Sequence, residues 1–446
     1  MVPTRIRAVR TLTAALVGGT LALGAAVAAS PTAVAEESGG VTIPAFYDPP
    51  TSLPAANGAI VRSQPTTLGV SLALPGLSGP LPGRATLLMY KSTDSAGRPV
   101  AVTGTYLEPT AAWAAGGARP LVSLAEGTQG QGDQCSPSYG LSHPLVVTPQ
   151  TLQVSYEIPF IYQLLSKGIA VVVTDYVGLG TTDRLHTYVN RLDEGHAVLD
   201  AARAAKRLAG TSLTSGSKVA TYGYSQGGGA SAAAAELQPA YAPDVKLVGS
   251  YAGAPPADLS VVLKGIDGTA LVGAIGWAVN GFAQAYPALR PILDANVSAN
   301  GRAVLQDLEQ ACTVDAISRY AFRSTSTWTT SGQSLSQIIG ANPTAKAIVD
   351  AQRIGKVKPT APVRISTGTL DDFVSHTQAK QLAADWCGRG ANVTYVPVKQ
   401  YLPTFGTGVN HLGPAATDSG AAQQWVVDRF LGKPVTSNCS SLPASG

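Results

Sequence analysis

Charged residues are scarce in this chain of 446 residues: Asp, Glu, Lys and Arg together make up 13%. No cluster of Lys and Arg follows Glu36, and no basic patch interleaved with aromatic residues does either, so nucleic-acid binding is disfavoured. The formal net charge of +4 becomes about +1 (4 − 3) without residues 1–35, which hold three arginines and no acids. Hydrophobic residues make up 45%, enough for a large buried core in one domain with an insertion, or in two domains.

Signals for metal and nucleotide sites are also absent from the sequence. None of the four cysteines lies in a C-x-x-C pair, so a zinc site has no support. The glycines of "DYVGLGTTD" fit neither the G-x-G-x-x-G dinucleotide pattern nor the P-loop pattern. We therefore expect no metal and no organic cofactor. An even number of cysteines in an exported protein favours two disulfides, and three pairings are open among Cys135, Cys312, Cys387 and Cys439.

The N-terminus has the layout of a secretory signal peptide. Three arginines precede an apolar run over residues 12–29, and the small-residue triplet Ala33-Val34-Ala35 stands just before Glu36. A membrane anchor is the alternative, but the run is short and three glycines interrupt it. We expect residues 1–35 to be removed by cleavage near Ala35 and the mature protein to be secreted.

The order of apolar runs predicts an α/β fold with an insertion. The N-terminal arm covers residues 36–85, and its Pro- and Gly-punctuated stretch at 46–58 predicts an irregular surface segment. Residues 85–109 predict an antiparallel hairpin around the turn Asp94–Gly97. Continuous apolar runs then predict buried parallel strands with helices between them, at residues 120–125, 168–175, 218–225, 246–255, 361–368 and 392–398. Core segments 86–254 and 359–446 thus flank a helical cap over residues 255–358.

One apolar stretch in the predicted cap, "TALVGAIGWAVNGFAQAYPAL", is long enough to suggest a transmembrane helix. Asn280, Gln284 and Pro287 interrupt it, and a secreted chain gives it no reason to span a bilayer. We expect a buried or partly exposed helix of the cap instead.

The stretch "TYGYSQGGGA" places Ser225 between Gly223 and Gly227, which is the nucleophile-elbow pattern G-x-S-x-G. A tightly packed glycine-rich turn is the competing interpretation. The predicted strand before Ser225 and the predicted helix after it favour the elbow, where the serine stands on a sharp strand-to-helix turn. Serine also needs a base to take its proton, so the interpretation depends on finding partners.

The acid and the base that would assist Ser225 follow from chain order. In the fold that carries the nucleophile elbow, this order is serine, then acid, then histidine. Two of the five histidines, His376 and His411, come after Ser225. His411 follows the last predicted strand, whereas His376 stands close behind the candidate acid at the start of a helix. Asp371 comes first off the turn after the strand at 361–368, and Asp372 is expected to cap the following helix. We therefore expect Ser225, Asp371 and His411 to act together.

An oxyanion hole needs two preorganised N–H donors. The backbone of Gln226, the residue after the nucleophile, supplies the first. The second is expected in the glycine-rich loop after the strand at 120–125, and Gly127 is the first glycine there. A flexible surface loop is the alternative for that segment.

Several stretches together resemble the secretory lipases, which are α/β-hydrolases with a helical cap. These stretches are "MYKSTDSAGRPVAVTGTYLEP", "EGTQGQGDQCSPS", "VVTDYVGLGT", "GYSQGG", "TLDDFV" and "NHLG". The resemblance implies Ser225 as nucleophile, Asp371 as acid, His411 as base and Gly127 as second oxyanion donor. It also implies disulfides Cys135–Cys312 and Cys387–Cys439. Many bacterial members have His-Gly-Thr where this chain has Glu126-Gly127-Thr128, a change that keeps the backbone donor.

These observations predict a secreted serine hydrolase that cleaves carboxylic esters, most specifically a lipase. A secreted acyltransferase, a peptidase and a hydrolase of small or polar esters would use the same triad, and a non-catalytic lipid-binding protein would keep the same fold. The large apolar insertion favours a long acyl chain or a lipid interface over a small soluble ester. We expect a lipid or other ester as substrate, transient contact of the cap with a lipid interface, and no partner protein.

Overall fold

The computed structural model describes residues 36–74 and 77–442 of the chain. The expected signal peptide and its cleavage site near Ala35 lie outside the described residues. Within the described part of the chain, nine strands form one sheet in the order β15-β14-β13-β12-β8-β11-β7-β6-β3. The strands from β15 to β11 are parallel: β8 (Leu121–Ala125), β11 (Ala170–Thr174), β12 (Val219–Tyr224), β13 (Leu247–Gly253), β14 (Val363–Gly368) and β15 (Val393–Val398). Each of them matches a strand predicted from a continuous apolar run; β8, β11, β12 and β14 are buried on both faces, whereas the edge strand β15 is buried on one.

The antiparallel end of the sheet consists of the predicted hairpin, β6 (Gly83–Thr93) and β7 (Pro99–Pro109), and of β3 (Ile60–Thr66). The expected irregular segment, residues 46–58, has no strand, but β3 shows that the arm after it joins the sheet. Pro65 is tolerated in β3 because this strand lies at the sheet edge. The remaining short strands form separate pairs: β1 (Glu36–Ser38) with β2 (Val41–Ile43), β4 (Ser71–Leu74) with β5 (Leu77–Pro80), and β9 (Leu145–Val147) with β10 (Leu152–Val154).

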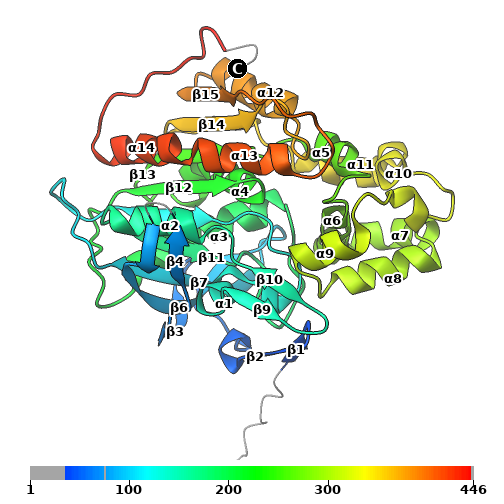
Figure 1. Ribbon diagram of the computed structural model, residues 1–446, viewed down its shortest axis with the longest axis horizontal. Coiled ribbons are helices and arrows are strands. Elements are labelled where there is room, and N and C mark those ends of the chain that lie inside the picture. Colours follow the sequence, from blue (N-terminus) through cyan, green and yellow to red (C-terminus); the bar gives the residue numbers. More distant parts are fainter. Residues whose placement is uncertain (1–35, 75–76, 443–446) are drawn as a thin grey trace, which may run out of the picture. The chain divides into compact units, whose positions relative to one another are not determined.

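Helices cover both faces of the sheet (Figure 1). Leu121 of β8 packs in one core cluster with α3 (Arg191–Arg207) and α4 (Gln226–Tyr241), whereas its neighbour Val122 packs with α2 (Ile158–Ser166) and α14 (Ser419–Phe430). This alternation follows from the two-residue period of a strand. Two further helices are α1 (Pro137–Ser142) and α12 (His376–Gly388), the latter packed with α4, β14 and β15. These observations confirm an α/β-hydrolase fold.

Between β13 and β14 the chain is helical. We call this part the helical insertion, and it corresponds to the predicted cap. Its helices are α5 (Leu259–Ile266), α6 (Gly273–Ala285), α7 (Arg290–Asn296), α8 (Ala299–Leu308), α9 (Thr313–Tyr320), α10 (Leu335–Ala341) and α11 (Pro343–Ala351). Trp277 and Trp328 are buried in its own hydrophobic cluster. The apolar stretch expected to be a cap helix forms α6, and no helix among residues 36–74 and 77–442 is long and apolar enough to cross a membrane.

Candidate active site

Ser225 stands on a sharp turn between β12 and α4. Its backbone has φ 58° and ψ −123°, a conformation that costs a non-glycine residue on the order of 1–3 kcal/mol and that functional sites retain. Its N–H donates to the carbonyl of Gly253 in β13 at 2.9 Å, which ties the turn to the neighbouring strand. The turn therefore has the geometry that the nucleophile-elbow pattern predicts.

The glycines around Ser225 permit close approach of backbone segments. A Cβ atom on Gly223 would lie 2.2 Å from the carbonyl oxygen of Gly227, and one on Gly227 would lie 1.9 Å from that of Ala125. A side chain at Gly223 would thus push α4 away from β12, and one at Gly227 would push α4 away from the end of β8. The glycines place the first turn of α4 beside the loop that begins at Glu126.

Asp371 and His411 meet at the carboxyl end of the sheet. His411 Nδ1 lies 2.9 Å from Asp371 Oδ2, and both side chains are buried. Asp371 Oδ1 also accepts the backbone N–H groups of Phe373 and Val374, which fixes the carboxylate on its turn. A carboxylate at Nδ1 holds the proton on that nitrogen and leaves Nε2 as the free base.

Asp372 differs from the expectation that it caps the helix after it. Its carboxylate instead accepts the N–H of Gly408 at 2.9 Å and that of His411 at 3.1 Å. These groups lie at the start of α13 (Val409–Thr417), a helix that was not predicted from the sequence. Gly408 has φ 86°, and a Cβ there would lie 2.6 Å from the Phe373 ring, so glycine is needed where α13 begins. Asp372 thus positions the helix that presents His411.

His376, the alternative histidine, is the first residue of α12, and its ring contacts the hydroxyl of Tyr395. Ser225 and His411, by contrast, line the same pocket. Tyr224, next to the serine, donates its hydroxyl to the backbone carbonyl of His411 at 2.7 Å. The structure therefore brings Ser225, Asp371 and His411 to one site, with His376 elsewhere.

The first residue of α4 is held by buried side chains. The amide of Gln226 donates to Glu194 at 2.8 Å and lies 2.9 Å from His186 Nε2. Burial lowers the pKa of His186 to about 4, so this ring is neutral and accepts the hydrogen bond. The backbone N–H of Gln226 opens the helix, where no preceding turn supplies an acceptor, and it remains a donor for an anion beside Ser225.

Gly127 lies beside Ser225 as expected, but its N–H is engaged. It donates to Glu157 Oε1 at 2.7 Å, and Glu157 stands directly before α2. Burial raises the pKa of Glu157 to about 8. Burial, and then the charges of Glu157 and Asp175, raise the pKa of Glu126 well above its ordinary value, while Gln129 donates to its carboxyl at 2.9 Å. Gly127 thus stands beside a pair of buried acids, Glu126 and Glu157.

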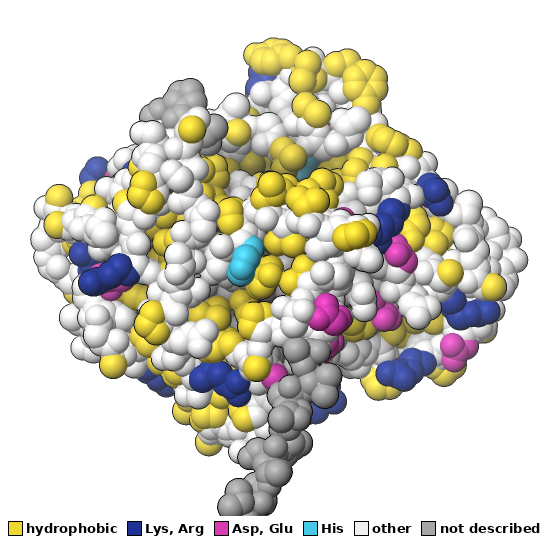
Figure 2. All heavy atoms as spheres, turned by 60° about the horizontal axis from the view of Figure 1, so that its bottom comes forward, with side chains coloured by type: hydrophobic (Ala, Val, Ile, Leu, Met, Phe, Trp, Pro, Cys, Tyr) yellow, Lys and Arg dark blue, Asp and Glu magenta, His cyan; other side chains and the backbone are white. Residues whose placement is uncertain are grey.

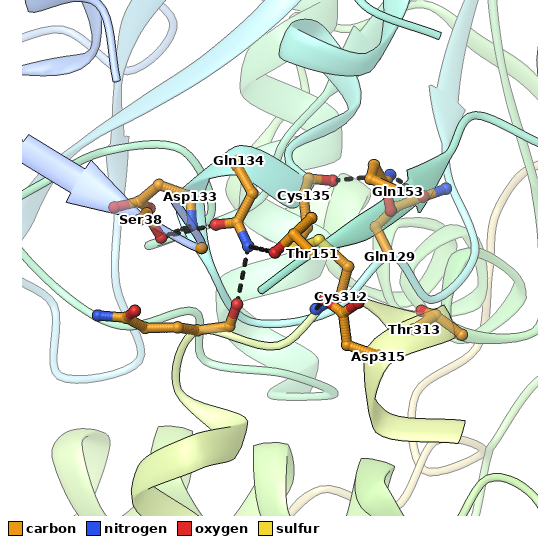
Figure 3. Close-up of a disulfide and its surroundings, with 12 residues drawn as sticks. Ser38, Gln129, Asp133, Gln134, Cys135, Thr151, Gln153, Cys312, Thr313 and Asp315 are labelled. Carbon is orange, nitrogen blue, oxygen red and sulfur yellow. Dashed lines mark hydrogen bonds between the residues drawn. A yellow bond between two sulfur atoms is a disulfide. The ribbon is translucent and has the colours of Figure 1, made fainter. Parts of the chain in front are cut away.

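A disulfide fastens the loop after Gly127 to the helical insertion (Figure 3). Cys135 pairs with Cys312, the residue before α9, and Thr313 donates its N–H to the carbonyl of Gln129 at 2.9 Å. The second disulfide joins Cys387 of α12 to Cys439 near the C-terminus. Both pairings are those that the resemblance implied, and disulfides are typical of exported proteins.

Two largely apolar pockets meet at Ser225. The first extends among the helices of the insertion and is lined, among others, by Tyr188, Leu263, Ile275, Ala278, Phe282 and Ile338. The second contains His411 and Gly127 and is also lined by Gln129, Gln153 and Tyr156. The sequence suggested the first through the apolar insertion. It gave no signal for Glu157 or Tyr156, which stand in an ordinary helix-entry segment.

Comparisons with known proteins match this chain to lipases. The family described as Secretory lipase matches residues 143–438. The Probable inactive lipase MT1628 of Mycobacterium tuberculosis is 31% identical over 392 residues, which cover 88% of this chain and 82% of that protein. Lipase 10 of Candida albicans is 29% identical over 403 residues, with the same coverage.

Solved structures show the same fold. Lipase A of Candida antarctica matches with a TM-score of 0.75 at 20% identity, covering 93% of this chain and 91% of that one. The rice cell wall degrading esterase LipA of Xanthomonas oryzae matches with a TM-score of 0.70 at 20% identity, covering 84% and 100%. The resemblance seen in the sequence is confirmed: the chain belongs to the secretory lipase family of ester hydrolases.

Proposed function

We propose that this protein is a secreted lipase that hydrolyses lipid esters through an acyl-enzyme on Ser225. The observation that supports this most directly is the 2.9 Å contact between His411 Nδ1 and Asp371 Oδ2 in a pocket that also contains Ser225. A serine on a strained elbow, a histidine with its Nδ1 fixed and a buried carboxylate are the parts of a nucleophilic triad.

In the proposed reaction, Ser225 Oγ attacks the ester carbonyl while His411 Nε2 takes its proton. The negative charge on the carbonyl oxygen develops beside the N–H of Gln226, and the N–H of Gly127 is the second donor once the Glu157 carboxyl releases it. His411 then gives its proton to the leaving alcohol, and the carbon–oxygen bond of the ester breaks. Water, deprotonated by the same histidine, frees the acid from Ser225.

The two pockets suggest where each half of the ester binds. The leaving alcohol must receive a proton from His411, so it belongs in the pocket that His411 lines. The acyl chain then belongs in the apolar pocket among the insertion helices. An acyl pocket lined largely by apolar side chains supports substrates with medium or long chains.

The test is hydrolysis of p-nitrophenyl esters from acetyl to palmitoyl by the mature protein beside Ser225→Ala. Activity that peaks at medium or long chains and disappears in the variant supports the lipase proposal. Activity confined to acetyl and butyryl esters contradicts the acyl-pocket assignment and favours a small-ester hydrolase. No Ser225-dependent turnover would leave a non-catalytic lipid-binding protein, or an acyltransferase that an added alcohol acceptor would reveal.

A further inference from the structure

The segment between β11 and α3 contains the stretch "DYVGLGTTD", to which the proposed reaction gives no role. Two of its residues have a left-handed backbone, Tyr176 with φ 68° and Gly178 with φ 78°. A Cβ atom on Gly178 would lie 2.1 Å from the carbonyl oxygen of Leu185, so glycine is needed where the segment folds back on itself. This fold brings the ring of His186 against that of Tyr176, stacked with the centroids 5.8 Å apart.

Two tyrosines of this segment hold the loop that carries Gly127. Tyr176 donates its hydroxyl to the carbonyl of Glu126 at 2.6 Å. The hydroxyl of Tyr188 lies 2.8 Å from Thr128 Oγ1. Because Glu126 and Thr128 flank Gly127 in the sequence, the residue expected to supply the second oxyanion donor is fastened on both sides.

His186 holds the residue that supplies the first oxyanion donor. Its Nδ1 donates to the carbonyl of Val177 at 3.0 Å, which leaves Nε2 to accept the side-chain amide of Gln226 at 2.9 Å. The other N–H of that amide is taken by Glu194. His186 is 0% exposed and does not reach the surface, unlike the histidine side chain seen in cyan in the middle of Figure 2. It therefore acts on the reaction only through its neighbours.

The three side chains form one packed unit, which we call the aromatic clamp: Tyr176, His186 and Tyr188. His186 stacks on Tyr176 on one side and meets Tyr188 edge-on at 5.9 Å on the other. Tyr188 in turn meets Trp277 of α6 edge-on at 5.8 Å. All three members are buried, and buried side chains pack too closely for one to move without its neighbours. The aromatic clamp thus links the loop after β8 to the first residue of α4.

The distance between the two donor segments matters for the chemistry. An oxyanion hole stabilises the transition state because its N–H groups already stand where the negative charge develops. Gln226 and Gly127 belong to different parts of the chain, so their relative position depends on what packs against both. A misplacement of about 1 Å in such a site can cost about 10²-fold in rate.

We propose that the aromatic clamp positions the N–H donors of Gln226 and Gly127 relative to each other, so that its three members are positioning residues for the reaction at Ser225. This inference rests on the proposed function. The members of the clamp exchange no proton with the substrate. Because the oxyanion exists only after Ser225 attacks, loosening the clamp should lower kcat and leave KM nearly unchanged.

The first test is Tyr176→Phe, which removes one hydroxyl and keeps the stacked ring. With p-nitrophenyl butyrate we expect kcat to fall by about tenfold or more and KM to change by less than about twofold. Tyr188→Phe should behave in the same way. A trifluoromethyl ketone inhibitor probes the hole directly: its carbonyl carbon bonds to Ser225 Oγ while His411 takes the proton, which leaves a negative oxygen in the hole. Its inhibition constant should rise by the same factor as kcat/KM falls.

The second test separates the two roles of His186. His186→Phe keeps a stacked ring but removes the acceptor for Gln226, whereas His186→Gln keeps an acceptor oxygen. We expect kcat to fall by about tenfold or more in the Phe variant and by less in the Gln variant. Gln226→Leu removes the same hydrogen bond from the other side. It should therefore lower kcat less in the His186→Phe protein than in the natural protein.

The matched control is Tyr106→Phe, which also removes a buried hydroxyl. Tyr106 donates to Glu108 Oε2 at 2.5 Å within β7 and lines neither pocket at Ser225. Clamp and control variants should lose similar amounts of denaturant midpoint, but only the clamp variants should lose kcat. An equal loss of kcat in the control, a loss confined to KM, or independent effects at His186 and Gln226 would overturn the inference.

The proposed function and this inference fail in different ways. Absence of Ser225-dependent ester hydrolysis by the natural protein would overturn the proposed function and this inference with it. Ser225-dependent hydrolysis that Tyr176→Phe and Tyr188→Phe retain in full would overturn this inference alone.

Discussion

The backbone N–H of Gly127 donates a 2.7 Å hydrogen bond to the buried carboxyl group of Glu157. The group expected to stabilise a reaction oxyanion is therefore paired with an acid of the protein itself. An ionised Glu157 would hold this N–H more tightly and would place a negative charge beside the developing oxyanion. A neutral Glu157 would do neither, so the activity is expected to depend on the protonation state of Glu157.

Glu157→Gln tests this relationship. Burial raises the pKa of Glu157 to about 8, so the carboxyl is neutral below that pH and ionises above it. Glu126 is a second buried acid beside it, and its pKa is raised by burial and then by the charges of Glu157 and Asp175. We expect kcat/KM of the natural protein to fall by about tenfold for each pH unit above 8. The Gln variant should keep its activity there, as a pH–rate profile with a soluble ester will show.

The free energy of unfolding of Glu157→Gln is an independent test of the same relationship. Because folding raises the pKa of Glu157, its contribution to stability is present below about pH 4.5 and is lost as pH rises through about 8. The free energy of unfolding of Glu157→Gln should therefore exceed that of the natural protein at pH 9 but not at pH 4. An identical alkaline loss of activity in both proteins would contradict a role for this carboxyl.

Asp371 and Asp372 are neighbours with separate expected roles. Asp371→Asn removes the carboxylate at His411 Nδ1, and we expect kcat to fall by about 10⁴-fold. Asp372→Ala removes the acceptor for the N–H groups of Gly408 and His411, and we expect a loss of about 1–2 kcal/mol in unfolding free energy with a smaller loss of kcat. Denaturant titration and single-substrate kinetics on both variants distinguish them. Equal losses of kcat would mean that the acid is misassigned.

The sequence predicted the parallel strands and Ser225 because continuous apolar runs and glycine spacing are local signals. It also predicted that Asp371 and His411 act together, and the two side chains do meet; the chain order of the fold leaves few candidates. It missed α13, because the carboxylate that stabilises the start of that helix comes from Asp372, far upstream. It missed the engagement of Gly127 for the same reason: Glu157 is distant in sequence and reaches the loop only through the fold.

The two disulfides can be removed separately, and the two resulting variants are expected to differ in kcat. Cys135–Cys312 links residues 177 apart in the sequence and joins the loop after Gly127 to the insertion. Cys387–Cys439 links residues 52 apart, and neither of its cysteines lines the two pockets at Ser225. Replacing either pair by serines should cost about 2–4 kcal/mol of unfolding free energy. Only the first replacement should also lower kcat, because only it loosens the loop that carries Gly127. Kinetics below the melting temperature of both variants will show this, and equal kcat in the two would refute the coupling.

The acyl-pocket assignment predicts a graded change of specificity. Ala278 of α6 lines the pocket among the insertion helices. Ala278→Val and Ala278→Phe add progressively larger side chains there, so the preferred acyl chain should shorten in that order. Acetyl ester hydrolysis should stay at its natural rate in both. A chain-length profile that does not move would place the acyl chain in the other pocket.

The central claim is that Ser225 forms the acyl-enzyme, and covalent labelling tests it most directly. A p-nitrophenyl alkylphosphonate should react with the serine, which forms an oxygen–phosphorus bond and releases p-nitrophenolate. Peptide mapping by mass spectrometry should then find the phosphonate on Ser225, in proportion to the lost esterase activity, and no labelling at this position after His411→Ala. Full inactivation with the label on another residue, or ester hydrolysis that continues with Ser225 fully labelled, would contradict the account.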